Sequence, residues 1–240
     1  MIAISLVVGL SAAAAAATGF GFNLVSAPLL TFVYPPRLVV VLTLLLGVCA
    51  SGMLLLRPEI RREVEWSVIR PLFLSSLAGM PIGVALLLWG RPQTLRAAIA
   101  ALTAAFAIAM LTRFRPRLRG TLLDTIAVGV LSGLLSTSTS LNGPPVALYL
   151  VARRLSMARF RGNMVVYVFL ATVTSLVLLA LGGTINTSTL ALAAKLLPAM
   201  ALGFVAGIAL VGRMSERGFE TMILGFLALV GLLGVSSALR

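Results

Sequence analysis

The chain has 240 residues, of which 60% are hydrophobic and only 10% are charged, and its mean hydropathy is +1.12. This composition excludes a soluble globular protein, because too few polar residues remain to face water, and it indicates an integral membrane protein. A net charge of +13 could suit nucleic-acid binding. The basic residues, however, lie in short segments between apolar ones, which is typical of membrane topology, and we expect no nucleic-acid partner.

Apolar segments recur along the chain and predict its membrane spans. They cover residues 2–18, 38–56, 71–89, 97–112, 121–136, 164–181, 189–212 and 221–239. Most reach the roughly 20 residues that cross a hydrocarbon core about 30 Å thick. The first segment has no basic leader and no clear cleavage site, so we expect it to belong to the fold. The lone Cys49 allows no internal disulfide.

Loop charges predict the orientation of the spans. Residues 57–70, 113–120 and 153–163 carry four arginines each and residues 213–220 carry two, together 14 of the 19 basic residues. The positive-inside rule places these segments in the cytoplasm. The connection 182–188 has no basic residue and is expected outside. With the spans counted from these loops, both termini are expected outside the cytoplasm.

The stretch between the loops 113–120 and 153–163 must enter and leave the membrane on one side. Its apolar piece 146–152 is about 11 Å long as a helix, which is too short to cross. We therefore expect a re-entrant hairpin, and the same plan for residues 2–34 gives a hairpin entering from outside. A full crossing by residues 2–18 is left open.

These expectations combine into one fold class. The chain is predicted to be an all-α polytopic helical bundle of two inverted repeats, each a re-entrant hairpin plus three transmembrane helices. Residues 1–112 form the first repeat, 113–120 an arginine-rich cytoplasmic linker and 121–240 the second repeat.

Internal matches support a duplication. An offset of 117 residues aligns Pro28 with Pro145 at the hairpins. A second offset of 124 residues aligns Arg37 with Arg161, Ser51 with Ser175, Gly79 with Gly203 and Gly83 with Gly207. A seven-residue insertion would reconcile the two offsets. The paired glycines are expected to serve close helix packing.

Two polar stretches, 19–28 and 136–145, break the apolar segments at matching points of the two halves. Irregular backbone survives at membrane depth only where protein buries it or a wet cavity receives it. Paired breaks therefore predict a transport site between two repeats. Half-helices starting near Leu24 and Pro144 would aim their N-termini at the membrane centre, where free N–H groups attract an anion.

The candidate substrate-binding residues are hydroxyl and amide donors together with two glycines that let the backbone approach closely. They are Gly21, Asn23, Ser26, Ser138, Thr139, Ser140, Asn142 and Gly143. The alternative is that these side chains only satisfy the broken backbone and join neighbouring helices. We expect Arg37 and Arg161 to be interfacial anchors rather than ligands. Lys195 is expected to extend outward, with a pocket role as the alternative.

A glycine-broken first segment ending at Pro28, the Leu-Ser-Gly-Leu-Leu…Gly-Pro-Pro pattern of the second half and the paired Gly-x-x-x-Gly spans resemble the sulfite exporter TauE/SafE family over nearly the whole chain. The resemblance implies a bacterial inner-membrane carrier that exports sulfite, thiosulfate or an organosulfonate such as sulfoacetate. Phe20 and Phe22 interleave with the first glycines, and we expect their rings to line the pocket for an organic part of the substrate.

The sequence indicates a transporter that is not an enzyme and that needs no metal or cofactor. The chain has no histidine, and Asp124 in a predicted first helical turn is the only carboxylate within an apolar segment, so no proton relay is visible. The partners expected are the lipid bilayer and a small sulfur-containing anion, with a homodimer left open. The alternatives are a passive anion channel, an uptake permease for thiosulfate or sulfonates, and a membrane subunit that transports nothing.

Overall fold

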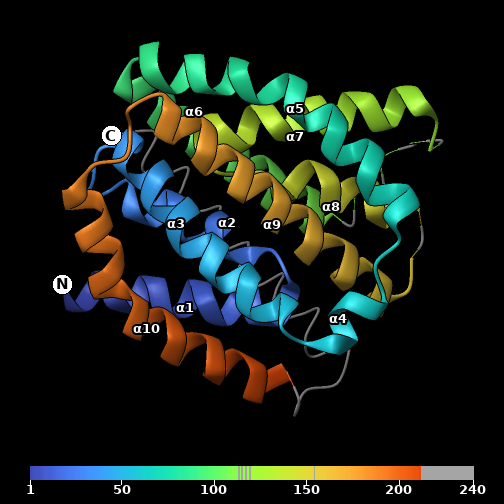
Figure 1. The fold of residues 1–240 in the computed structure, drawn as a ribbon, viewed down its shortest axis with the longest axis horizontal. Helices are drawn as coiled ribbons and strands as arrows, with labels where there is room; N and C mark the ends of the chain where they lie inside the picture. The colour runs from blue at the N-terminus through green and yellow to red at the C-terminus, as the bar shows by residue number, and fades with distance from the viewer. Residues whose placement is uncertain (113, 115, 117, 119, 154, 212–240) are drawn as a thin grey trace.

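The computed structural model describes the chain except for residues 113, 115, 117, 119, 154 and 212–240 (Figure 1). The described residues form helices and no strand, which confirms the all-helical prediction. The helices are α1 Ile2–Thr18, α2 Gly21–Leu30, α3 Pro36–Leu55, α4 Pro58–Arg62, α5 Trp66–Trp89, α6 Pro92–Leu111, α7 Leu122–Thr139, α8 Gly143–Ala152, α9 Met157–Leu181 and α10 Thr187–Val211.

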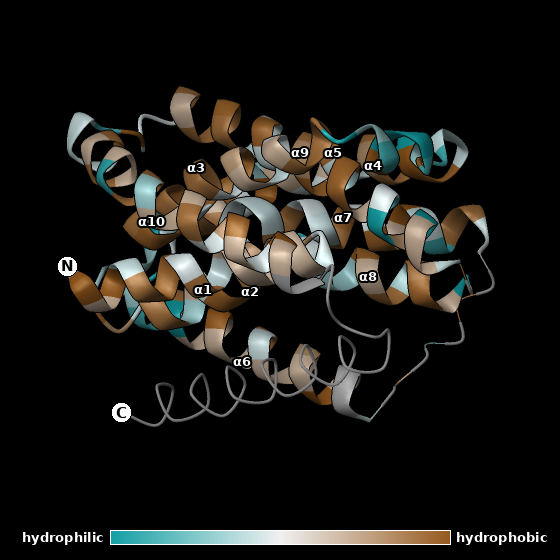
Figure 2. Ribbon diagram, turned by 90° about the horizontal axis from the view of Figure 1, so that it is seen from below, coloured by the Kyte–Doolittle hydropathy of each residue, from teal (hydrophilic) through white to brown (hydrophobic). Residues whose placement is uncertain are grey.

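Six of these helices, α3, α5, α6, α7, α9 and α10, are long and apolar enough to cross a membrane, and α1, α2 and α8 are shorter apolar helices. Apolar residues cover most of the ribbon, whereas hydrophilic residues gather around α4 (Figure 2). The protein is thus a multi-pass helical membrane protein. The predicted span 221–239 and the arginines at 113, 115, 117, 119, 154, 213, 217 and 240 lie outside the described residues.

Several helices begin before the apolar segments that predicted them. Helix α9 begins at Met157 rather than at residue 164, and α5 begins at Trp66 rather than at residue 71. The extra turns carry arginines, which form helices readily although they lower hydropathy. Helix α4 lies inside the predicted loop 57–70 and was not foreseen; proline at its start favours a helical turn there.

The bundle has two ends, which we name after the elements found there. At the α4 end, Gly162 of α9 packs against Ile60 and Glu63, and Arg159 pairs with Glu65 at 3.1 Å. At the opposite Arg37 end, the start of α3 contacts the end of α5, where Arg37 donates to the carbonyl of Leu87. Helix α8 ends near the α4 end and α2 ends near the Arg37 end, so the two hairpins open in opposite directions.

Each half of the chain packs one of its helices against a helix of the other half. Helix α5 lies along α7, and α10 lies along α1 (Figure 1). A Cβ built on Gly79 would lie 2.0 Å from the carbonyl oxygen of Val130, and one built on Gly203 would lie 2.0 Å from that of Gly9. The paired glycines therefore allow the backbones to approach closely, as expected.

The two hairpins correspond at a different offset from the predicted one. Helices α1 and α7 end at Thr18 and Thr139, and the next residues, Gly19 and Ser140, both have a left-handed backbone. These pairs are 121 residues apart, which differs from the offset of 117 predicted for the hairpins, and the duplication with its seven-residue insertion stays a prediction. Inversion of the two halves across a membrane stays a prediction.

Candidate functional site

The breaks in the two hairpins are short. Gly19 (φ 88°) ends α1 and Ser140 (φ 63°) ends α7, and these are the left-handed positions that often close a helix. Helix α2 begins at Gly21, three residues before the predicted Leu24, whereas α8 begins at Gly143 with its prolines in the first turn, as predicted. Only Ser140 and Asn142 of the candidate residues stand outside a helix.

The two hairpin tips contact each other. The side-chain nitrogen of Asn23 donates to the carbonyl oxygen of Ser140 at 3.0 Å. The hydroxyl of Thr43 on α3 lies 2.9 Å from that of Ser140. Asn23 and Ser140 are 4% and 0% exposed, so the contact is shielded from outside. The prediction that the tips at Asn23 and Ser140 lie close together is confirmed.

A buried polar network holds the second tip. The amide nitrogen of Asn142 lies 3.2 Å from the Ser136 hydroxyl and 3.3 Å from the Thr172 hydroxyl. The carbonyl oxygen of Asn142 accepts from Ser132 at 2.6 Å, and Ser132 accepts from Tyr167 at 2.8 Å. The donors of Asn142 are therefore committed to protein groups in this conformation.

Three further candidate hydroxyls bond within their own helices. Ser26, Ser138 and Thr139 donate to the carbonyls of Phe22, Leu134 and Leu135, one turn back, at 2.7, 2.7 and 2.9 Å. This local bonding lets serine and threonine continue a helix in an apolar environment, which explains why α7 runs through the predicted break. An anion would gain these donors only if the hydroxyls rotated.

The N-cap residues of the two half-helices, Phe20 and Asn142, make no side-chain cap hydrogen bond, and the two N-termini differ in their free N–H groups. In α2, the N–H of Gly21 donates to the Thr18 hydroxyl at 3.0 Å. The next residues, Phe22 and Asn23, add two N–H groups of the kind that a helix leaves without an intrahelical partner. In α8, Pro144 and Pro145 have no N–H, so Gly143 is the only donor among the first three residues.

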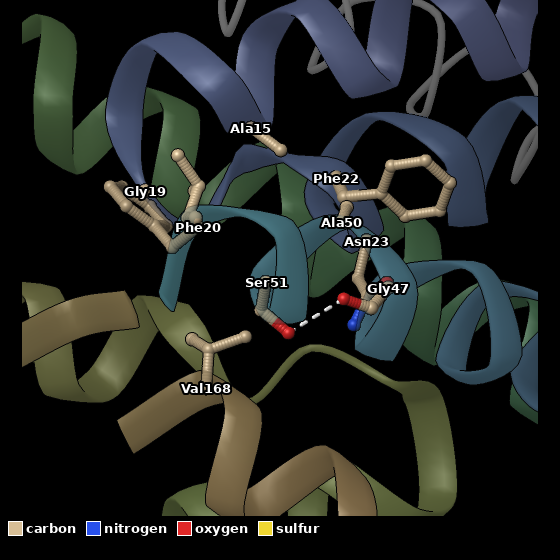
Figure 3. A pocket seen from close by; sticks show the side chains of 10 residues that line it. Ala15, Gly19, Phe20, Phe22, Asn23, Gly47, Ala50, Ser51 and Val168 are labelled. Atoms are coloured by element: carbon tan, nitrogen blue, oxygen red, sulfur yellow. Dashed lines mark hydrogen bonds between the residues drawn. The ribbon is translucent and has the colours of Figure 1, made fainter. Parts of the chain in front are cut away.

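A small cavity lies beside the first tip (Figure 3). The centre of a water molecule could occupy about 10 Å³ of this cavity, so the cavity has room for about one water molecule. Its lining includes Gly19, Phe20, Phe22, Asn23, Ser51 and Val168. Both phenylalanines line it, and their expected role toward an organic part of the substrate stays a prediction. Asn23 is the only predicted site residue in the lining; Gly21, Ser26 and the residues of the second tip are not part of it.

The polar atoms of this cavity face it mainly as acceptors. The side-chain oxygen of Asn23 is buried without a hydrogen-bond partner. The hydroxyl of Ser51 donates to the Gly47 carbonyl at 2.8 Å, so it offers lone pairs to the cavity (Figure 3). Sequence reasoning used Ser51 only as a repeat match. Its position in the same apolar span as Gly47 carried no signal of a site.

Phe20 separates the cavity from the start of α8. A Cβ built on Gly143 would lie 3.0 Å from the Phe20 ring, so the glycine lets the aromatic ring approach the helix N-terminus. The same ring meets Phe106 and Phe160 edge-on, with centroids 6.4 and 6.1 Å away. Phe20 thus fills the space between the two half-helix N-termini.

The charged residues of the spans have different environments. Arg37 donates to the carbonyls of Leu87 and Leu88 at 3.0 and 2.6 Å and so holds the end of α5. Arg161 donates to the Ala16 carbonyl at the end of α1, while its Nε is buried without a partner. Lys195 is exposed on α10 and does not line the cavity.

Asp124 stabilises the start of α7, as predicted. Its carboxylate accepts from the Thr121 N–H at 3.1 Å, and its own N–H donates to the Thr121 hydroxyl at 3.2 Å. This reciprocal capping box accounts for a carboxylate at the edge of an apolar segment.

A family model described as sulfite exporter TauE/SafE matches residues 1–233. Comparisons with curated proteins and with solved structures gave no match. The family match includes both hairpins and every described helix, and it agrees with the resemblance seen in the sequence. The chain therefore belongs to the sulfite exporter TauE/SafE family of membrane transporters for sulfur-containing anions.

Proposed function

We propose that the protein exports a sulfur-containing oxyanion, either sulfite or an organosulfonate such as sulfoacetate, across the inner membrane. One observation carries the proposal: two half-helix N-termini lie at contacting hairpin tips, neither N-cap residue makes a side-chain cap hydrogen bond, and the first N-terminus lies beside a cavity. Such N-termini attract anions through N–H groups and the helix dipole.

The proposed binding set is the one predicted from the sequence, with an order given by the geometry. Asn23, Ser140, Asn142 and Gly143 form the inner group, because they lie at the tips. Gly21 belongs to the first turn of α2, and Ser26, Ser138 and Thr139 join after their hydroxyls leave the helix carbonyls. Neutral donors hold an anion without a strong ion pair, which favours release.

Transport requires a second conformation in this proposal. The present cavity has room for about one water molecule, whereas a sulfur oxyanion has several heavy atoms. The tips are also joined through Asn23 and Ser140. We propose that the tips separate and Phe20 moves to admit the anion, which then leaves on the opposite side.

The membrane arrangement is part of the same proposal. The two halves are inverted repeats, the α4 end faces the cytoplasm and both termini lie outside. Opposite opening of the two hairpins supports the inversion. With a negative cell interior, each negative charge leaving the cell gains about 2.3 kcal/mol per 100 mV. Export of an anion then needs no coupled cation.

Flux into proteoliposomes tests the function. Purified protein should transport sulfite or sulfoacetate with saturable kinetics, and it should transport thiosulfate more slowly. The zwitterion taurine should be a poor substrate. An inside-negative potential should accelerate efflux. Linear, non-saturating flux would favour the passive channel, potential-opposed accumulation would favour an uptake permease, and no flux of any sulfur anion would contradict the proposal.

A further inference from the structure

We infer that Arg161 binds the charged group of the transported anion on the α4 side of the cavity, as a substrate-contacting residue in addition to the hairpin donors. The inference rests on the proposed function and names a residue that the hairpin pattern did not assign to the site. It assigns to the arginine the oxyanion end of the substrate, namely a sulfite or sulfonate group.

Contacts place Arg161 beside the cavity. A Cβ built on Gly19, which lines the cavity, would lie 3.3 Å from the Cγ of Arg161 and 3.0 Å from Val165. Val168, two turns along α9 from Arg161, lines the cavity itself. Arg161 and Val165 therefore share with Val168 the face of α9 that meets the first hairpin tip.

The guanidinium of Arg161 has an N–H donor that no protein group accepts. One terminal nitrogen donates to the Ala16 carbonyl at the end of α1, which fixes the side chain. The Nε–H is buried, and it has no hydrogen-bond partner. A buried donor without a partner is unfavourable, and more so when the group is charged. The arrangement thus favours an acceptor that the protein itself does not provide.

The electrostatic environment of Arg161 also favours a negatively charged ligand. Among the residues that the structure describes, the ion pair recorded joins Arg159 to Glu65, and Arg161 takes part in none. Arg57, which carries a like charge, acts electrostatically on Arg161. A half-buried cation beside another cation is unfavourable unless an anion compensates it. The missing partner is therefore negatively charged.

Arg37 provides the comparison within the same chain. It occupies the start of α3 as Arg161 occupies the first turns of α9, and it also holds a helix end. Its Nε, however, donates to the Leu87 carbonyl at 3.0 Å. The Nε of Arg37 is thus used in its structural cap, whereas Arg161 caps α1 and keeps its Nε–H for a ligand.

The inferred site also explains how an oxyanion could bind beside a cavity whose own polar atoms are hydrogen-bond acceptors. Its own polar atoms, the Asn23 oxygen and the Ser51 hydroxyl, present lone pairs, which repel an oxyanion. Arginine donates in a planar fork that matches the spacing of sulfite or sulfonate oxygens. With the oxyanion at Arg161, an organic substituent would lie along Phe20 and Val168, which are apolar.

Calorimetric titration of the purified protein with sulfite and with sulfoacetate tests the inference. Arg161→Gln should raise Kd about tenfold or more, as expected for losing a hydrogen bond to a charged group. Arg37→Gln is the matched control, because it removes a helix-end cap at the corresponding position, and its Kd should stay within about twofold of wild type. The melting temperature of each variant is also measured without ligand, so that stability lost with the helix-end cap is distinguished from lost anion binding.

The outcomes separate the two proposals. If wild type binds and Arg161→Gln binds with unchanged Kd, the inference is wrong and the proposed function stands. If wild type neither binds nor transports any sulfur anion, both the proposed function and the inference are wrong. If Arg161→Gln does not fold, Arg161→Lys decides: it keeps the charge that caps α1 but lacks the Nε–H, so an unchanged Kd overturns the inference.

Discussion

The side-chain nitrogen of Asn23 donates to the backbone carbonyl of Ser140 across 117 residues of sequence, at 3.0 Å. The bond joins the first turn of α2 to the left-handed residue that ends α7. Because its acceptor belongs to the backbone, substitution of Ser140 leaves this bond in place, whereas substitution of Asn23 removes it. The two tips can thus be perturbed independently.

Ser140 allows its hydroxyl and its backbone to be tested separately. Ser140→Gly removes the hydroxyl that meets Thr43 but suits φ 63°, so it should fold normally and bind the anion more weakly. Ser140→Ala removes the same hydroxyl but keeps the Cβ, so it retains the left-handed penalty of about 1 to 2 kcal/mol that Ser140 already has and that Ser140→Gly relieves. Affinity should therefore fall alike in both variants, while Ser140→Gly should be the more thermally stable of the two. Equal affinity to wild type in both would exclude the hydroxyl from the site.

Asn142→Ala should lower anion affinity about tenfold to hundredfold, because one lost hydrogen bond to a charged ligand is worth about 1.5 to 3 kcal/mol. Flux normalised to the protein inserted in the liposomes measures the effect. Ser75→Ala is the control, since this hydroxyl only donates to the carbonyl of Pro71 on its own helix. A loss of the same size in the control would point to general destabilisation.

Gly79→Ala should reduce the amount of folded protein without changing which anion is preferred. The added methyl group would lie 2.0 Å from the Val130 carbonyl oxygen and would push α5 away from α7. Overpacking of this kind costs about 1 to 3 kcal/mol. Gly52→Ala is the matched control within a helix, because its nearest contact would be an ordinary 3.6 Å to Phe169. A changed order of substrate preference in Gly79→Ala would contradict a purely packing role.

Phe20→Ala should widen the space between the tips and favour bulkier organosulfonates over sulfite. The ring contacts Phe106 and Phe160 and covers Gly143, so its removal opens the start of α8. The ratio of sulfoacetate to sulfite transport in proteoliposomes is the readout. Phe32→Ala, at a side chain that is 48% exposed, should leave this ratio unchanged. An unaltered ratio in Phe20→Ala would remove the ring from the pathway.

Orientation can be checked with single cysteines introduced after Cys49→Ala. A reagent that cannot cross the membrane should label Ile185→Cys in intact cells, because this position lies in the connection after α9 that carries no charge. Arg62→Cys, exposed at the end of α4, should react only after the cells are opened. The reversed labelling pattern would invert the proposed topology.

The sequence predicted the class of fold and the meeting of the tips for physical reasons that are local. Apolar length identifies spans, and a break at membrane depth requires burial or a cavity. Asn23 and Ser140 were both predicted site residues, and their contact follows from placing two such breaks in one bundle.

Other features were beyond sequence reasoning because they depend on three-dimensional contacts. Whether the hydroxyls of Ser138 and Thr139 face a ligand or their own helix cannot be read from residue type. The cavity lining from α3, with Ser51, required the packing of α3 against the first tip. The free Nε of Arg161 depends on the approach of α1, and the sequence assigned Arg161 and Arg37 the same role.

The pairing of α1 with α10 has a consequence for biosynthesis. Helix α1 ends at Thr18, and its partner begins only at Thr187. At a synthesis rate of about 5 to 20 residues per second, α1 waits roughly ten to forty seconds for the surface that covers Gly9 and Ala13. Helix α5, by contrast, meets α7 soon after it emerges. A ribosome that stalls after α9 would leave the first hairpin in the membrane without the helix that flanks it.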